Sequence, residues 1–135
     1  MANVKNVDHV GIRVSDKEAA LRFYQMFGFE VDPQEDDAEV KAVGMVNDSG
    51  ARIHLIYNSS GPHAEGNVLL DHAVKWPGYT HTAFIVEDLD EILALLEREN
   101  IRITEGPLIL GHGRRRAIFF RDPDLNVVEF NEILA

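Results

Sequence analysis

With 135 residues, 45% of them hydrophobic, the chain has the length and composition of one globular domain with a packed core. A formal net charge of −10 disfavours nucleic acid and anionic membranes as partners, and the absence of cysteine excludes disulfides and thiolate ligands. No apolar run reaches the ~18 residues that span a bilayer, and Met1–His9 lacks the apolar stretch of a secretory signal, so we expect a cytoplasmic protein.

The first half of the sequence predicts the element order βαβββ. Alternating β-branched residues predict a strand over Val7–Val14. A helix follows, with Ser15 and Glu18 as its capping box and Gly28 as its end. The remaining predicted segments are a strand at Phe29–Val31, an acidic loop at Gln34–Asp37, and a hairpin of Val40–Val46 and Ala51–Tyr57 around the turn Asn47–Gly50.

The second half predicts the same order after a connector. The connector has a short helical turn at Val68–Val74 and is interpreted as a plain linker or as a lid. The predicted elements are a strand at Thr80–Val86, a helix at Leu89–Asn100 capped by Asp88, a strand at Ile101–Thr104 that ends before Gly106-Pro107, and a final hairpin of Arg115–Arg121 and Asn126–Ile133. We expect a single domain over residues 1–135, with a first module of about 1–58, a connector of about 59–77 and a second module of about 78–135.

An internal repeat relates four side chains that can bind metals. HVGIRVSD begins at His9 and returns as HTAFIVED at His81, 72 residues later. RIHLIY and NVVEFN match at an offset of 75, which relates His54 to Glu129. A lone strand histidine is more often a core residue than a ligand, but four related donors favour a divalent metal site. Three imidazoles and one carboxylate suit Zn, Ni, Fe, Mn or Co better than Mg or Ca.

Three motifs, in order, resemble the vicinal-oxygen-chelate superfamily, which includes glyoxalase I, methylmalonyl-CoA epimerase, bleomycin-resistance proteins and extradiol dioxygenases. They are DHVGIRVSD with the following RFYQMFGFEV, then GYTHTAFIVEDLDEI, then FFRDPDLNVVEF, and they cover nearly the whole chain. The resemblance implies an α+β fold of two βαβββ modules, whose curved mixed sheets surround a metal-centred cavity. It also implies a homodimer, in which the active site can be shared between chains.

The resemblance places the metal ligands of the family on His9, His54, His81 and Glu129. Position 54 departs from the family, because glyoxalase I usually has Glu there and the epimerase Gln. If His54 is a ligand, an octahedral ion keeps two open positions, which suits proton transfer on a substrate that binds through adjacent oxygens. If His54 is turned away, three positions are open, enough for a catecholate and dioxygen. A second departure is Leu125, where the family usually has a glycine with positive φ, so we expect a strained or altered turn.

Four further residues are candidates for substrate chemistry. His112 lies between two glycines and could approach a substrate as a catalytic group. Arg114 and Arg116 could bind a substrate carboxylate or phosphate, because strand alternation turns both to one side and Arg115 to the other. Tyr79 could line the mouth of the cavity. The competing interpretations are a solvated loop for the histidine, a solvated strand start for the arginines, and packing for the tyrosine.

Together these patterns predict a metal-dependent, glyoxalase-I-like lyase or isomerase acting on a small, metal-chelating oxygenated substrate. Glu129 would serve as a ligand and as the proton carrier. One alternative is an extradiol-type Fe(II) dioxygenase that cleaves a catecholic ring. Another is a non-catalytic resistance protein that binds a drug or metabolite. The expected partner is a small molecule, with neither nucleic acid nor membrane.

Overall fold

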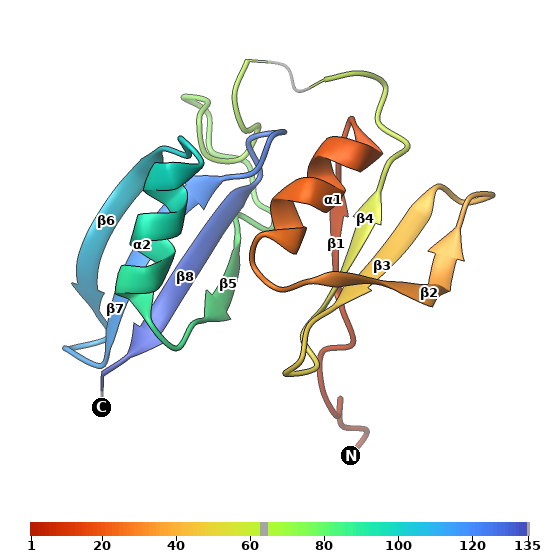
Figure 1. Ribbon diagram of the computed structural model, residues 1–135. Coiled ribbons are helices and arrows are strands. Elements are labelled where there is room, and N and C mark those ends of the chain that lie inside the picture. The colour runs from red at the N-terminus through yellow and green to blue at the C-terminus, as the bar shows by residue number, and fades with distance from the viewer. Residues whose placement is uncertain (63–64, 135) are drawn as a thin grey trace. The chain divides into compact units, whose positions relative to one another are not determined.

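The computed structural model describes residues 1–62 and 65–134, and the chain divides into two compact units, Met1–His63 and Ala64–Ala135. Each unit contains one helix and a four-stranded mixed sheet in the order βαβββ (Figure 1), which confirms the predicted α+β class and its two modules. The exact module limits stay a prediction, and residues 63 and 64 of the expected connector lie outside the described part. None of the described helices is long and apolar enough to cross a membrane.

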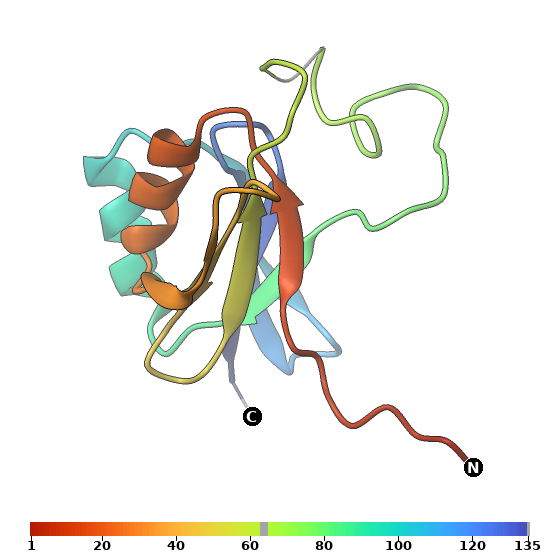
Figure 2. The ribbon, with the colours of Figure 1, turned by 90° about the vertical axis from the view of Figure 1, so that its right-hand side faces the viewer.

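The first unit has the strand order β1-β4-β3-β2, in which β1 runs parallel to β4 and the other neighbours are antiparallel. Helix α1 lies along one face of this sheet (Figure 2) and buries Phe23 and Tyr24. Alternate residues of the central strand, Ile53 and Leu55, are fully buried, as the period of a strand requires. The bounds are Val10–Arg13 for β1, Lys17–Gln25 for α1, Glu30–Asp37 for β2, Ala42–Val46 for β3 and Arg52–Ile56 for β4.

The start of α1 differs from the prediction. Asp16, and not Ser15, is the N-cap: its side chain accepts a hydrogen bond of 3.1 Å from the backbone N–H of Ala19. Asp16 has the extended backbone of a cap residue, and a carboxylate is favoured at the positive end of the helix dipole. The capping-box prediction on Ser15 is therefore wrong by one residue.

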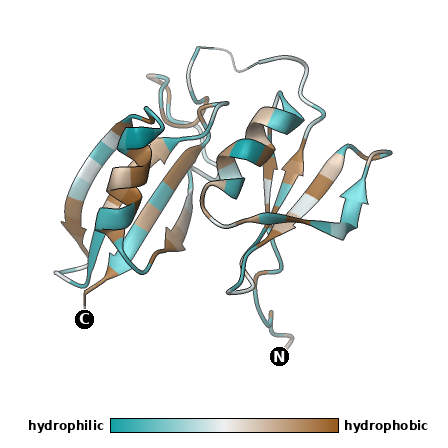
Figure 3. Ribbon diagram, viewed as in Figure 1, coloured by the Kyte–Doolittle hydropathy of each residue, from teal (hydrophilic) through white to brown (hydrophobic). Residues whose placement is uncertain are grey.

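The predicted acidic loop Gln34–Asp37 is the second part of β2. Its pairing with β3 shifts register between Val31 and Asp36, so the strand continues beyond an irregularity. Because β2 is an edge strand, its charged side chains and Pro33 are tolerated and discourage pairing with other chains. Figure 3 shows this end of β2 as hydrophilic. Propensity alone predicted a loop here because it does not include edge position.

The second unit has the strand order β5-β8-β7-β6, with β5 parallel to β8. Asp88 caps α2 as predicted, since its side chain accepts from the backbone N–H groups of Asp90 and Glu91. Edge-to-face contacts of Phe130 with Phe84 and Phe120 contribute to the core. The bounds are Thr82–Ile85 for β5, Leu89–Arg98 for α2, Ile103–Leu110 for β6, Arg115–Arg121 for β7 and Val127–Ile133 for β8.

The predicted break at Gly106-Pro107 lies inside β6, which continues to Leu110 with two shifts of register against β7. A Cβ atom at Gly106 would lie 2.6 Å from the carbonyl oxygen of Ala117. Glycine is therefore needed for the close approach of two strands, and it does not end the strand.

The short helical turn predicted at Val68–Val74 is present as a single turn at its start. Asp71 donates its backbone N–H to the carbonyl of Asn67, four residues before it, at 2.9 Å. Both Nη atoms of Arg121 donate to the Asp71 carboxylate, at 2.8 and 2.9 Å, and the Asn67 side chain donates to the carbonyl of Leu125. These contacts hold residues 67–71 against the β7–β8 turn.

Candidate metal centre

The predicted ligands lie on the faces of the two sheets that point away from the helices. In β1, Ile12 is buried whereas Gly11 and Arg13 are exposed, so His9, just before the strand, shares the exposed face. In β5, Phe84 belongs to the aromatic core, and His81 precedes the strand on the opposite side. This alternation agrees with the sequence analysis.

The sheet registers relate the ligands of the two units. In the first sheet, His54 on β4 lies opposite Gly11 of β1 and Gly44 of β3. In the second, Glu129 on β8 lies opposite Ala83 of β5 and Phe119 of β7. Gly11 and Ala83 each follow the repeated histidine by two residues. His54 and Glu129 are therefore equivalent in backbone position as well as in sequence.

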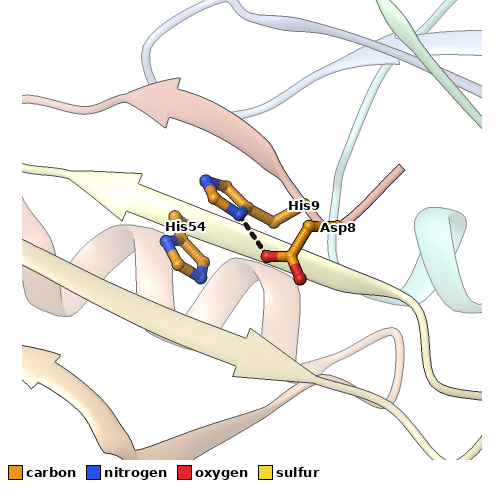
Figure 4. A group of neighbouring side chains, drawn as sticks. All are labelled: Asp8, His9 and His54. Atoms are coloured by element: carbon orange, nitrogen blue, oxygen red, sulfur yellow. Dashed lines mark hydrogen bonds and ion pairs between the residues drawn. The ribbon is translucent and has the colours of Figure 1, made fainter. Parts of the chain in front are cut away.

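In the first unit, the rings of His9 and His54 are stacked, with centroids 3.6 Å apart and planes inclined by 9°. The carboxylate of Asp8 lies 2.7 Å from Nδ1 of His9 (Figure 4). One donor atom from each of these three residues lies within 4.8 Å of the others. The cluster therefore offers two imidazoles and a carboxylate to a metal ion.

His54 is held in a form that can bind a metal. Burial, and then repulsion by His9, lower the pKa of His54, so its neutral ring is favoured. Its Nε2 is buried and has no hydrogen-bond partner among the described residues. The ring leans over Gly44, where a Cβ atom would lie 3.1 Å from Nε2. Since imidazole lone pairs lie in the ring plane, one stacked ring must turn before both bind the same ion.

In the second unit, Nε2 of His81 lies 3.0 Å from Oε1 of Glu129. The other ring nitrogen, Nδ1, lies 2.8 Å from the hydroxyl of Thr80. Glu129 is only 6% exposed, and the rings of Phe119 and His81 lie nearly perpendicular, with their centroids 5.6 Å apart. Two donors bound about 2.1 Å from one ion at right angles lie roughly 3.0 Å apart. The spacing of this pair therefore fits a shared ion.

Asp8 and Thr80 were not identified from the sequence. Each directly precedes a repeated histidine and contacts its Nδ1. The Asp8 carboxylate can only accept, so it favours the His9 tautomer with the proton on Nδ1 and leaves Nε2 for a metal, whereas the Thr80 hydroxyl orients the His81 ring with either tautomer. The repeat itself carried the signal, because a polar residue stands before the histidine in both copies. The grouping of all four predicted ligands around a single ion stays a prediction.

The predicted substrate residues differ in what surrounds them. Tyr79 is 99% exposed, and His112 and Arg114 are exposed in the segment between β6 and β7. Arg116 lies on the helix side of β7, where its Nη2 is 3.0 Å from the carboxylate of Asp90 at the start of α2. That contact accounts for Arg116 without a substrate. The roles predicted for all four residues stay predictions.

Several solved structures share this fold at low sequence identity. A glyoxalase/dioxygenase from Nostoc punctiforme has a TM-score of 0.79 and 20% identity, covering 98% of this chain and 94% of its own. A glyoxalase family protein from Bacillus cereus has a TM-score of 0.74 and 19% identity, covering 99% of this chain and 97% of its own. The antibiotic-binding protein TnmS3 from Streptomyces sp. CB03234 has a TM-score of 0.70 and 19% identity, covering 99% of this chain and 100% of its own.

The sequence also matches a family model over nearly its whole length. The model describes the glyoxalase/bleomycin resistance protein/dioxygenase superfamily and spans residues 6–130. This range includes both repeated histidines, His54 and Glu129. The protein therefore belongs to the glyoxalase/bleomycin resistance protein/dioxygenase superfamily.

Proposed function

We propose that the protein is a divalent-metal-dependent lyase or isomerase of the glyoxalase type, which moves a proton on a small substrate with adjacent oxygens. The observation that carries this proposal is the contact of His81 Nε2 with Glu129 Oε1, at 3.0 Å, on a sheet whose counterpart carries His54 at the equivalent position. His9, His54, His81 and Glu129 would hold Zn, Ni, Fe, Mn or Co. When bound, such an ion polarises the substrate oxygens and makes the neighbouring C–H bond more acidic.

The residues themselves supply the proton transfer. Glu129 is a buried carboxylate, and we assign it the acceptance of the substrate proton and its return to a neighbouring atom. His81 orients Glu129, and Thr80 in turn orients His81. Burial keeps bulk water away from the carboxylate, so the proton is retained for the return step.

The replacement Glu129→Gln tests this role. In metal-loaded protein, we expect exchange of the substrate α-hydrogen for deuterium in D2O to slow by about 100-fold or more, because general-base catalysis is lost. The Michaelis constant should change only a few-fold. A panel of 2-hydroxy carbonyl compounds followed by NMR gives both numbers. Glu97→Gln, on the exposed side of α2, is the matched control. Equal loss of turnover and affinity would identify Glu129 as structural.

Metal dependence tests the donor set separately. Elemental analysis should find one transition metal ion per site, and a chelator should abolish both exchange and tight substrate binding. Light scattering tests the homodimer that we also propose. Ligand affinity that survives chelation would favour a non-catalytic binding protein instead.

An Fe(II) dioxygenase is the second candidate, and the position of His54 favours it. Its ring is stacked on that of His9, so the two rings cannot both bind one ion as they stand, and His9, His81 and Glu129 would then form the ligand set. Anaerobic loading with Fe(II), followed by a catechol and oxygen, should then give a yellow ring-cleavage product. If no product forms with any catechol, this candidate is rejected.

A further inference from the structure

Three arginines of β7 differ in their partners. Arg116 contacts Asp90 at 3.0 Å, and Arg121 donates twice to Asp71. The Nε atoms of Arg115 and Arg121 are both buried without a hydrogen-bond partner in residues 1–62 and 65–134, but the guanidinium of Arg121 is already neutralised by Asp71. A buried donor without a partner costs stability, and a bound ligand is one way to satisfy it.

Asn131 presents a second unpaired polar atom. Its side chain is 6% exposed, and its Oδ1 is buried with no partner within the described part of the chain. It lies two residues after Glu129 on β8. Glu132 faces α2, since its carboxylate accepts from the backbone N–H of Leu89, and Phe130 shares this face because it lies two residues before Glu132 on the strand. Asn131 and Glu129 therefore share the opposite face.

Arg115 lies on that same face, because its neighbour Arg116 contacts α2. It pairs with Ile133 across the sheet, two residues beyond Asn131. Glu129 and Asn131 thus follow one another along β8, and Arg115 of β7 lies beside the end of this row, about 14 Å from Glu129 to Ile133 at ~3.4 Å per residue. Each has one small and one large cross-strand neighbour: Ala83 and Phe119 lie beside Glu129, and Ala117 and Ile85 lie beside Asn131.

We propose that Arg115 binds an anionic end of the substrate and that Asn131 accepts a hydrogen bond from its hydroxyl, so that the substrate is a hydroxy acid with a carboxylate remote from its chelating oxygens. This inference rests on the proposed function, which places those oxygens near Glu129. The remote carboxylate accepts from Nε of Arg115, and the substrate hydroxyl on the side of Glu129 donates to Oδ1 of Asn131. The guanidinium lies against the β6–β7 turn, since a Cβ atom at Gly111 would lie 3.7 Å from its Nη1.

Calorimetric titration of the nickel-loaded protein compares 2-hydroxyglutarate with 2-hydroxypentanoate, which has the same chain length but no second carboxylate. We expect wild type to prefer the dicarboxylate by about 10- to 100-fold, the range of a charge-assisted hydrogen bond. Arg115→Met should abolish the preference and leave binding of 2-hydroxypentanoate unchanged. Asn131→Leu should weaken binding of both ligands alike, because both carry the 2-hydroxyl, whereas Arg102→Met, an exposed control, should change neither. If Arg114→Met abolishes the preference and Arg115→Met does not, the inference is overturned.

Two readouts separate this inference from the proposed function. In metal-free protein, acetate should shift the Arg115 Nε–H resonance downfield, whether or not the protein is an enzyme. Arg115→Met should not lower the melting temperature, because Nε has no protein partner to lose. An unmoved resonance together with a retained dicarboxylate preference would overturn the inference, even if metal-dependent exchange is found. A shifted resonance without exchange would support the anion site and reject the proposed function.

Discussion

The two units differ most at the strand position beside the last predicted ligand. Gly44 lies opposite His54 in the first sheet, whereas Phe119 lies opposite Glu129 in the second. The glycine lets the His54 ring lean across to the next strand, and the phenylalanine contacts the histidine of its own unit instead. The same backbone register thus supports a stacked imidazole pair in one unit and a histidine–carboxylate pair in the other.

A second difference concerns the residue before each repeated histidine. Asp8 contacts Nδ1 of His9 with a charged carboxylate, and hydrogen bonding to His9 lowers the pKa of Asp8. Thr80 contacts Nδ1 of His81 with a neutral hydroxyl. Both contacts orient the histidine ring through Nδ1, but only the contact of Asp8 is charge-assisted. The two units therefore keep a side-chain contact to Nδ1 of the repeated histidine, but the contacting group is charged in the first unit and neutral in the second.

The glycines that flank His54 give the strongest test of this comparison. Gly44→Ala would place a Cβ atom 2.7 Å from Cβ of Glu35 and 3.1 Å from Nε2 of His54. We expect a loss of about 1–3 kcal/mol in unfolding free energy from overpacking, together with displacement of the His54 ring resonances. The matched control is Gly11→Ala, on the other side of His54, where an added Cβ meets nothing within 4 Å. Equal losses from the two variants would contradict a specific role of Gly44.

Replacing the residues before the histidines tests the second difference. Asp8→Asn should weaken the affinity for zinc or nickel by about 10-fold, the lower range for loss of a partner that orients a metal ligand. Thr80→Val should weaken it less, because the lost contact is neutral. Competition with a chromophoric chelator measures both affinities. Nitrogen chemical shifts should show a change of tautomer at His9 only in the Asp8 variant. A larger effect from Thr80→Val would reverse the proposed order.

The turns that precede the last strand of each unit form another matched pair. Asn47 and Asp122 each accept hydrogen bonds from two later backbone N–H groups, and the fourth turn residue has positive φ in both. That residue is Gly50 at 85° in the first unit and Leu125 at 65° in the second. Because a positive φ is costly for leucine and not for glycine, Gly50→Leu should lower the free energy of unfolding by about 1–2 kcal/mol. Leu125→Gly should raise it by up to about 1 kcal/mol. Thermal unfolding measures both. Destabilisation by Leu125→Gly would show that the leucine side chain contributes more than its backbone costs.

The smallest expected effect is the pH dependence of the connector contact, which has no counterpart among the contacts described in the first unit. Hydrogen bonds from Arg121 hold the pKa of Asp71 well below its usual range. The contact of Asp71 with Arg121 therefore contributes fully to the free energy of unfolding above the unfolded pKa of Asp71, about 3.9. This contribution is lost as the pH falls through the lower pKa of Asp71 in the folded protein. Calorimetry should show wild type more stable than Asp71→Asn above pH 5, with the difference shrinking below about pH 4. A difference independent of pH would mean that the charge of Asp71 is unimportant.

Much of the fold was predictable because it depends on local patterns and on the repeat. The α+β class, the cap at Asp88 and the final hairpin were confirmed, since hydrophobic period and turn residues determine them locally. The turn at Leu125 was expected to be strained, and its positive φ agrees. The acidic part of β2 and the passage of β6 through Gly106 were predicted wrongly, because edge position and strand approach are tertiary properties.

The sequence by itself determined which four side chains are equivalent, because duplicated strands keep their register and alternation. It also determined that any metal must bind nitrogen and oxygen donors. Only the tertiary structure decided that Asp8 and Thr80 contact the histidines, and that Arg116 contacts Asp90 of α2. It also decided that Arg115 Nε and Asn131 Oδ1 are buried without a hydrogen-bond partner among the described residues. These properties depend on side-chain packing and on which groups across a sheet satisfy one another, and a linear pattern does not specify them.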